Sequence, residues 1–160
     1  MNSKEINSQL PLGRNLAILT KNYYGALSKR LEHLEIDKHY SVLVFISQSK
    51  IKCTQQFISD NLKIDKTSMV SVIDYFVKKN FLKRIVNPDD RREHWIELTK
   101  KAEKILPELF FEINKLNEEA LDGLTQKEKE TFEKAVCSIS NNLSKMPSTR
   151  ILINYKKAKK

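Results

Sequence analysis

A β-hairpin is predicted by three consecutive pieces of sequence, Leu82-Lys-Arg-Ile-Val86, Asn87-Pro-Asp-Asp-Arg-Arg92 and Glu93-His-Trp-Ile-Glu-Leu98. The outer pieces carry strand-forming residues, and the middle one is polar and rich in turn formers. Its loop projects Arg91 and Arg92. A guanidinium at a hairpin tip can enter a narrow minor groove of DNA, where the negative potential is enhanced. We expect Asp90 to hold the Arg92 guanidinium by an ion pair.

Two short helices precede this hairpin. Thr54 can cap a helix that runs to Leu62, and Asp65 can cap another that runs to Lys79, because each side chain can accept a bond from an unpaired amide of the first turn. Only Lys63 and Ile64 separate the two helices. A turn this tight between amphipathic helices indicates a helix-turn-helix, and the hairpin that follows would make it a winged one.

The second of these helices has two chemically different faces. The apolar face is expected in the core and consists of Met69, Ile73, Phe76 and Val77. The opposite face carries Thr67, Ser68, Ser71 and Tyr75, with Lys66 and Lys78 near the ends and Asp74 at the edge. Short hydrogen-bonding groups of this kind suit insertion between the phosphate walls of a groove. A solvated helix face is the alternative interpretation.

Longer helices flank the winged segment on both sides. Apolar residues at spacings of three and four predict a helix from Leu12 to Leu34. A shorter helix is expected over Tyr40–Gln48, although its β-branched run is also compatible with a strand. On the other side, Thr99 caps a helix that is kinked at Pro107 and ends near Gly123.

The last helix begins at the capping box Thr125-Gln-Lys-Glu128 and ends at Met146-Pro147. Its apolar stripe, like those of the other long helices, would be exposed if the helix stood alone. We therefore expect the long helices to pack together, within one chain and against a second copy.

Composition excludes several classes of protein. The 160 residues are 40% hydrophobic, enough for a core, and no apolar run approaches the roughly 18 residues of a membrane span. The chain begins without a secretory signal pattern, so we expect a cytoplasmic protein. Its isolated glycines form no nucleotide-binding fingerprint. His33, His39 and His94 lack a metal-ligand spacing, and no nucleophilic motif is present. We therefore expect no enzyme activity, no metal and no cofactor.

The positive charge is unevenly distributed. Lys and Arg number 29 against 20 Asp and Glu, which gives a net charge of +9. Residues 144–160 hold six basic residues and no acidic one, so two thirds of this excess lies in a C-terminal tail. Such tails are most often solvated, although this one could touch nucleic acid or an anionic membrane.

The wing region resembles that of the MarR family of bacterial transcriptional regulators. The resemblance is carried by Lys78-Lys-Asn-Phe-Leu-Lys-Arg84, Asn87-Pro-Asp-Asp-Arg-Arg92 and Ile96-Glu-Leu-Thr99. It implies a mainly α (α+β) winged helix-turn-helix fold with long terminal dimerisation helices. Residues 1–36 and 100–143 would form the dimerisation region, residues 37–99 the DNA-binding region, and residues 144–160 the basic tail. The partners would be a second copy and a palindromic operator.

The resemblance also implies roles for individual residues. Asp65 to Lys79 would be the recognition helix, Arg92 the wing-tip arginine and Asp90 its supporting acid. The full predicted DNA-contact set is Lys63, Lys66, Thr67, Ser68, Ser71, Tyr75, Lys78, Arg84, Asp90, Arg91 and Arg92. The chain departs from the family pattern at Lys63, Asn80 and Ala102, where glycine is common, and at Ser71, where arginine is common. Base preference is therefore not transferred.

Two forms of regulation are compatible with the resemblance. A small aromatic or phenolic acid could enter a crevice lined by Tyr23, Tyr24, His39, Tyr40 and Phe45, unless these residues are plain core. Alternatively, Cys53 could sense oxidants near Lys50 and Lys52, whereas Cys137 is expected to be structural. The predicted function is a dimeric repressor released by such a signal. The alternative is a dimeric winged-helix interaction module that acts through a protein partner and binds DNA only nonspecifically.

Overall fold

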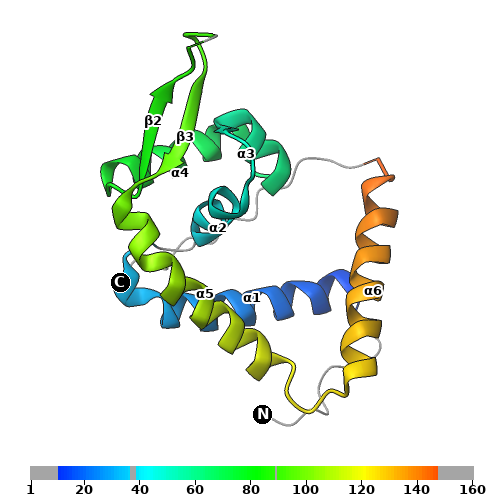
Figure 1. Cartoon of the computed structure of the whole chain (residues 1–160). Coiled ribbons are helices and arrows are strands. Elements are labelled where there is room, and N and C mark those ends of the chain that lie inside the picture. The colour runs from blue at the N-terminus through cyan, green and yellow to red at the C-terminus, as the bar shows by residue number, and fades with distance from the viewer. Residues whose placement is uncertain (1–10, 37–38, 89, 148–160) are drawn as a thin grey trace, which may run out of the picture. The chain divides into compact units, whose positions relative to one another are not determined.

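The computed structural model describes residues 11–36, 39–88 and 90–147 (Figure 1). The elements are α1 (Leu12–Arg30), η1 (Glu32–Leu34), α2 (Tyr40–Gln48), β1 (Cys53–Thr54), α3 (Gln55–Leu62), α4 (Lys66–Lys78), β2 (Leu82–Val86), β3 (His94–Leu98), α5 (Lys100–Ala120) and α6 (Gln126–Ser144). The chain divides into two compact units, Met1–Leu116 and Asn117–Lys160. The basic tail from residue 148 onward lies outside the described residues.

The predicted helix order is confirmed, and so are the caps that set the helix starts. Thr54 Oγ1 accepts the Phe57 amide at 3.2 Å, and Asp65 Oδ1 accepts the Ser68 amide at 2.9 Å. The capping box at the start of α6 is complete in both directions. The first long helix is shorter than predicted, because α1 ends at Arg30 and a separate 3₁₀ turn, η1, follows. Helix α5 continues through Pro107.

The sheet has three antiparallel strands in the order β1-β3-β2. Leu82 pairs with Leu98 and Val86 with His94, which makes the predicted hairpin, and Figure 1 shows this hairpin extending away from the helices of its unit. Strand β1 was not predicted. It has two residues and pairs Cys53 with Ile96, so it is too short to show the alternation that identifies a strand from sequence.

One apolar core joins the end of α1, the helix-turn-helix, the sheet and the first part of α5. Its largest fully buried side chains include Leu27, Leu43, Ile58, Met69, Ile73, Phe76, Phe81, Ile96 and Leu109. On α4 the structure buries Val72, whereas the predicted core residue Val77 is half-buried. The stripe therefore follows positions 69, 72, 73 and 76, the i, i+3, i+4, i+7 face of a helix.

Two helices carry apolar side chains that are exposed among the described residues. In the first unit, Leu12, Leu16 and Leu19 of α1 are exposed, although Leu16 and Leu19 belong to the apolar spacing that predicts this helix. In the second unit, no residue of α6 is buried, and its stripe contains Phe132 and Val136, both more than 40% exposed. Contiguous apolar surface of this kind marks interaction sites in soluble proteins.

Two residues at positions where the resemblance implies glycine adopt the left-handed backbone conformation. Lys63, which ends α3, has φ 53°, and Asn80, which follows α4, has φ 60°. Asparagine tolerates this region well, but for lysine its Cβ crowds the following carbonyl. The tight turn between α3 and α4 therefore imposes strain at Lys63.

Replacing Lys63 by glycine is expected to raise the free energy of unfolding by roughly 1 kcal/mol, because the left-handed conformation costs a residue with a Cβ about that much. Urea denaturation measures the change. Lys63→Ala is the matched control, since it removes the same charge and keeps the Cβ. A glycine variant no more stable than the alanine variant would show that the turn is unstrained.

Candidate nucleic-acid interface

The outward face of α4 is largely accessible, as the sequence predicted. Thr67 and Ser71 are exposed and Ser68 is half-buried. The Ser71 hydroxyl donates to the Thr67 carbonyl at 3.3 Å, which leaves its oxygen lone pairs free to accept a bond. Lys66 begins the helix, Lys78 ends it, and both are exposed. The face therefore combines short polar groups with a cation at each end.

Tyr75 differs from the other residues predicted on this face. Its hydroxyl donates a hydrogen bond to the backbone carbonyl of Glu35 at 2.9 Å, and its ring is half-buried beside Phe76. The hydroxyl is thus engaged within the chain, forty positions away in sequence. This contact makes Tyr75 a tie between α4 and the end of η1.

The wing loop is shaped by hydrogen bonds at its base and tip. At the base, Asn87 is buried, its amide donates to the Glu93 carbonyl at 3.0 Å, and its side chain donates to the Glu93 carboxylate at 3.1 Å. At the tip, the Asp90 carboxylate accepts the Arg92 backbone amide at 2.9 Å. The expected ion pair between Asp90 and the Arg92 guanidinium is therefore wrong. Asp90 fixes the turn, and both Arg91 and Arg92 are exposed.

The predicted cations differ in how they are compensated. Arg84 Nη2 lies 2.6 Å from Asp74 Oδ1, so this arginine ties β2 to α4 and its charge is balanced within the chain. Among the described residues, no carboxylate lies within ion-pair distance of Lys63, Lys66, Lys78, Arg91 or Arg92. These five exposed cations are the ones available to phosphates.

The start of α4 and the wing tip open onto one cleft. Lys66 and Arg92 both line it, together with Arg84 and His94 from the sheet and with Gln55 and Gln56 from the first turn of α3. The sequence pattern had not singled out His94 or the two glutamines. The available signal was the position of the glutamines directly after the cap Thr54, because the first turn of a helix carries unpaired amides that attract anions.

The predicted ligand-lining residues form two groups. Tyr24 contacts both Tyr23 and Tyr40, with ring centroids 5.9 Å and 6.3 Å apart, and His39 immediately precedes Tyr40. Burial raises the pKa of Tyr23, and the Tyr24 hydroxyl adds to the shift, so Tyr23 stays a neutral phenol. Phe45 instead packs against Phe57 of α3.

The two cysteines have environments opposite to those expected. Cys53 lies on β1, is 2% exposed, and its thiol donates to the Ile51 carbonyl at 3.6 Å. Burial denies an oxidant the access that a redox sensor needs, so the prediction for Cys53 is wrong. Cys137, expected to be structural, is exposed on α6. Its neighbour Val136 is exposed as well, and no residue of α6 is buried, which explains why the apolar stripe did not bury Cys137.

The described residues contain neither a metal-ligating cluster nor a membrane-spanning helix. No group of three or more His, Cys, Asp or Glu side chains is arranged to hold a metal ion among them. Within the same ranges, none of the helices combines the length and apolar character needed to cross a membrane.

The order α3, tight turn, α4, β2, wing loop, β3 defines a winged helix-turn-helix protein. The model of the MarR family matches residues 37–94, the segment that contains these elements up to the start of β3. The family model thus covers the winged helix-turn-helix of this chain, and the resemblance inferred from the wing is confirmed.

Solved structures agree with this assignment over most of the chain. A MarR transcriptional regulator from Methanosarcina mazei Go1 is 22% identical with a TM-score of 0.75, over 84% of this chain and 97% of that one. Wild-type MarR from E. coli in its apo form is 24% identical with a TM-score of 0.68, over 83% and 98%.

A protein from Listeria monocytogenes, described as a MarR family transcriptional regulator complexed with 26mer DNA, is 18% identical with a TM-score of 0.76. That match covers 84% of this chain and 90% of the Listeria chain. At these identities the likeness concerns the fold, which is therefore that of MarR-family transcriptional regulators.

Proposed function

We propose that the chain is a dimeric, sequence-specific DNA-binding transcriptional regulator. Each protomer would place α4 in a major groove and its wing in the adjoining minor groove. The observation that carries the proposal is the shared cleft, because Lys66 at the start of α4 and Arg92 at the wing tip line the same opening. A phosphate backbone that follows this cleft would meet cations from both elements. The Listeria protein of the same fold is described in complex with 26mer DNA, which supports DNA binding by this fold.

The exposed apolar residues support a dimer. Leu12, Leu16 and Leu19 on α1 and Phe132 and Val136 on α6 form stripes that a second copy could bury. Residues 1–36 and 100–143 would then be the dimerisation region. The two copies of α4 would meet half-sites about 34–36 Å apart, and the operator would be palindromic.

Release by a small aromatic or phenolic acid is the regulation that we propose. The cluster of Tyr23, Tyr24 and Tyr40 supports it, because aromatic rings stack on one another and a neutral phenol can donate to a carboxylate. The ring contact between Tyr24 and Tyr40 joins α1 to α2, so a ligand inserted there would separate these helices. Regulation by repression follows if the operator overlaps a promoter.

Selection from a random-sequence DNA pool, followed by competition, tests the proposal. The full-length protein is expected to enrich a palindromic duplex and to prefer it over random duplex at constant salt. The affinity is expected to fall steeply with salt, because lysines and arginines displace counterions from phosphates. A steep salt dependence without any preference would instead favour the alternative, an interaction module that acts through a protein partner.

A further inference from the structure

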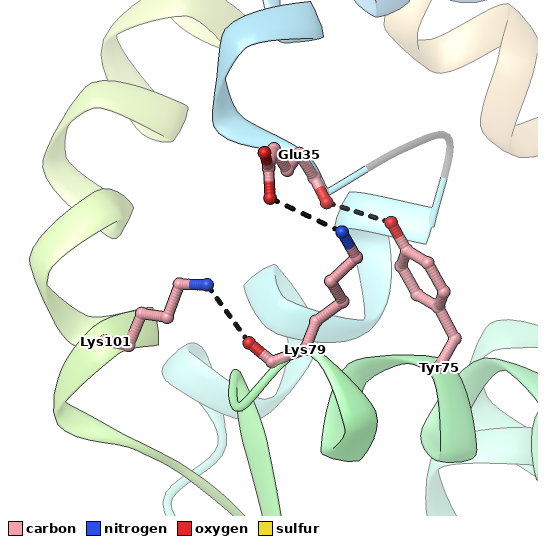
Figure 2. A network of polar contacts seen from close by, with 4 residues as sticks. All are labelled: Glu35, Tyr75, Lys79 and Lys101. Atoms are coloured by element: carbon pink, nitrogen blue, oxygen red, sulfur yellow. Dashed lines mark hydrogen bonds and ion pairs between the residues drawn. The ribbon is translucent and has the colours of Figure 1, made fainter.

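The C-terminal end of α4 is held where three elements meet (Figure 2). Glu35 is the C-cap of η1; its carbonyl accepts the Tyr75 hydroxyl at 2.9 Å, and its carboxylate lies 3.4 Å from Lys79 Nζ. From α5, Lys101 Nζ donates to the Lys79 carbonyl at 3.1 Å. We name these four residues, Glu35, Tyr75, Lys79 and Lys101, the Glu35 junction.

Glu35 reaches α4 with two groups because of its backbone conformation. Its φ of 54° lies in the left-handed region, directly after the 3₁₀ turn of η1. A residue with a Cβ adopts this conformation at a cost, and it persists where the surroundings hold it. Figure 2 shows the Glu35 carbonyl directed at Tyr75 and its carboxylate directed at Lys79. The bend thus delivers one residue to two positions of α4, one turn apart.

Lys101 of α5 holds the same helix end. The last carbonyls of a helix lack partners within it and carry partial negative charge, so an ammonium is favourable there. Lys79 is the C-cap of α4, and its carbonyl accepts Lys101 Nζ. The ammonium also lies 4.2 Å from the Phe81 ring centroid, which restricts it further. Helix α4 is therefore tied at its end to both η1 and α5.

These contacts fix the orientation of α4 relative to η1 and α5. Apolar packing alone would fix this orientation less sharply. A hydrogen bond weakens steeply when its angle departs from linearity, whereas apolar contacts have no preferred direction. Only Leu31 separates α1 from η1, so a tie between η1 and α4 constrains the angle between α1 and the helix that enters the groove. In a dimer assembled through α1, that angle sets the separation of the two copies of α4.

We propose that Tyr75 and Glu35 are positioning residues that set the operator half-site spacing by fixing α4 relative to α1. The proposal rests on the proposed function, because spacing has meaning only for a dimer on two half-sites. It assigns Tyr75 a role different from the base contact that its place on α4 predicts from sequence.

The experiment compares three duplexes: the one that the wild-type protein selects, and the same duplex with one central base pair inserted or removed. One base pair changes the separation of the half-sites by about 3.4 Å and rotates one against the other. The wild-type protein is expected to prefer the selected spacing. Tyr75→Phe removes only the hydroxyl and is expected to lower this preference roughly three- to tenfold.

Glu35→Gln is the second variant, and Glu32→Gln is its control. Glu35→Gln keeps the backbone carbonyl and weakens an exposed pair, so its effect on spacing preference is expected to be smaller than that of Tyr75→Phe. Glu32→Gln removes the same charge three positions earlier, where Glu32 pairs with Lys29 of α1. The control is expected to keep the wild-type preference.

The outcomes separate the two proposals. Equal loss of affinity by Tyr75→Phe for all three duplexes would indicate a direct DNA contact or a general structural role, and would overturn the positioning role. An unchanged preference would overturn it as well. Failure of the wild-type protein to select any duplex would instead overturn the proposed function.

Discussion

The Arg92→Ala variant is expected to bind the selected duplex at least about tenfold more weakly than the wild-type protein. A bidentate arginine contact contributes roughly 1–3 kcal/mol of discrimination, and a homodimer would lose two such contacts. Arg92 is exposed at the wing tip. Its backbone amide donates to the Asp90 carboxylate at 2.9 Å, so a hydrogen-bonded turn presents the side chain. Gel-shift titration at constant salt measures the change.

Two further variants test whether the loss of affinity is specific to the wing. Lys134→Ala removes one exposed positive charge from α6 and is expected to leave binding nearly unchanged. Arg92→Lys keeps the charge but not the planar fork, so it is expected to recover affinity for random duplex and not the preference for the selected one. Arg92→Ala binding as tightly as the wild-type protein would remove the wing from the interface.

The Phe76→Ala variant is expected to lose roughly 3–5 kcal/mol of unfolding free energy. Phe76 is fully buried on α4, and its ring meets Phe81 edge to face with centroids 6.1 Å apart. Its removal would leave a cavity where α4 and the start of β2 contact the core. Urea denaturation followed by circular dichroism measures the loss.

Val70→Ala is the control on the same helix. Val70 is 41% exposed, so its truncation is expected to change the unfolding free energy by less than about 0.5 kcal/mol. Equal effects of the two substitutions would contradict the placement of the core face at positions 69, 72, 73 and 76.

Local features of the fold could be read from sequence because their causes are local. Thr54, Asp65 and Thr125 each cap a helix through an amide three positions ahead, so residue type and spacing suffice to place the helix start. The hairpin followed in the same way from two strand-forming runs and a polar turn. The winged helix-turn-helix was predictable for this reason.

Features that depend on contacts distant in sequence could not be predicted. The Tyr75 hydroxyl bonds to Glu35, and Cys53 lies in the core on a strand that pairs with Ile96. The ion pair predicted for Asp90 is wrong for another reason. Residue spacing places the Asp90 carboxylate near Arg92, but it does not decide whether the guanidinium or the backbone amide is the donor. The core could be predicted to within a residue or two, because both Val72 and Val77 suit an apolar helix face.

Hydroxyl-radical footprinting on the selected duplex tests the central claim most directly. A dimer that reads DNA with α4 and the wing predicts two symmetric protected regions, centred about one helical turn apart, each with an adjoining protected minor groove. The Arg92→Ala variant is expected to lose the protection of the minor-groove sugars beside each half-site, while protection of guanine N7 in the major groove against methylation remains. A single protected region, or uniform protection without a boundary, would contradict the account.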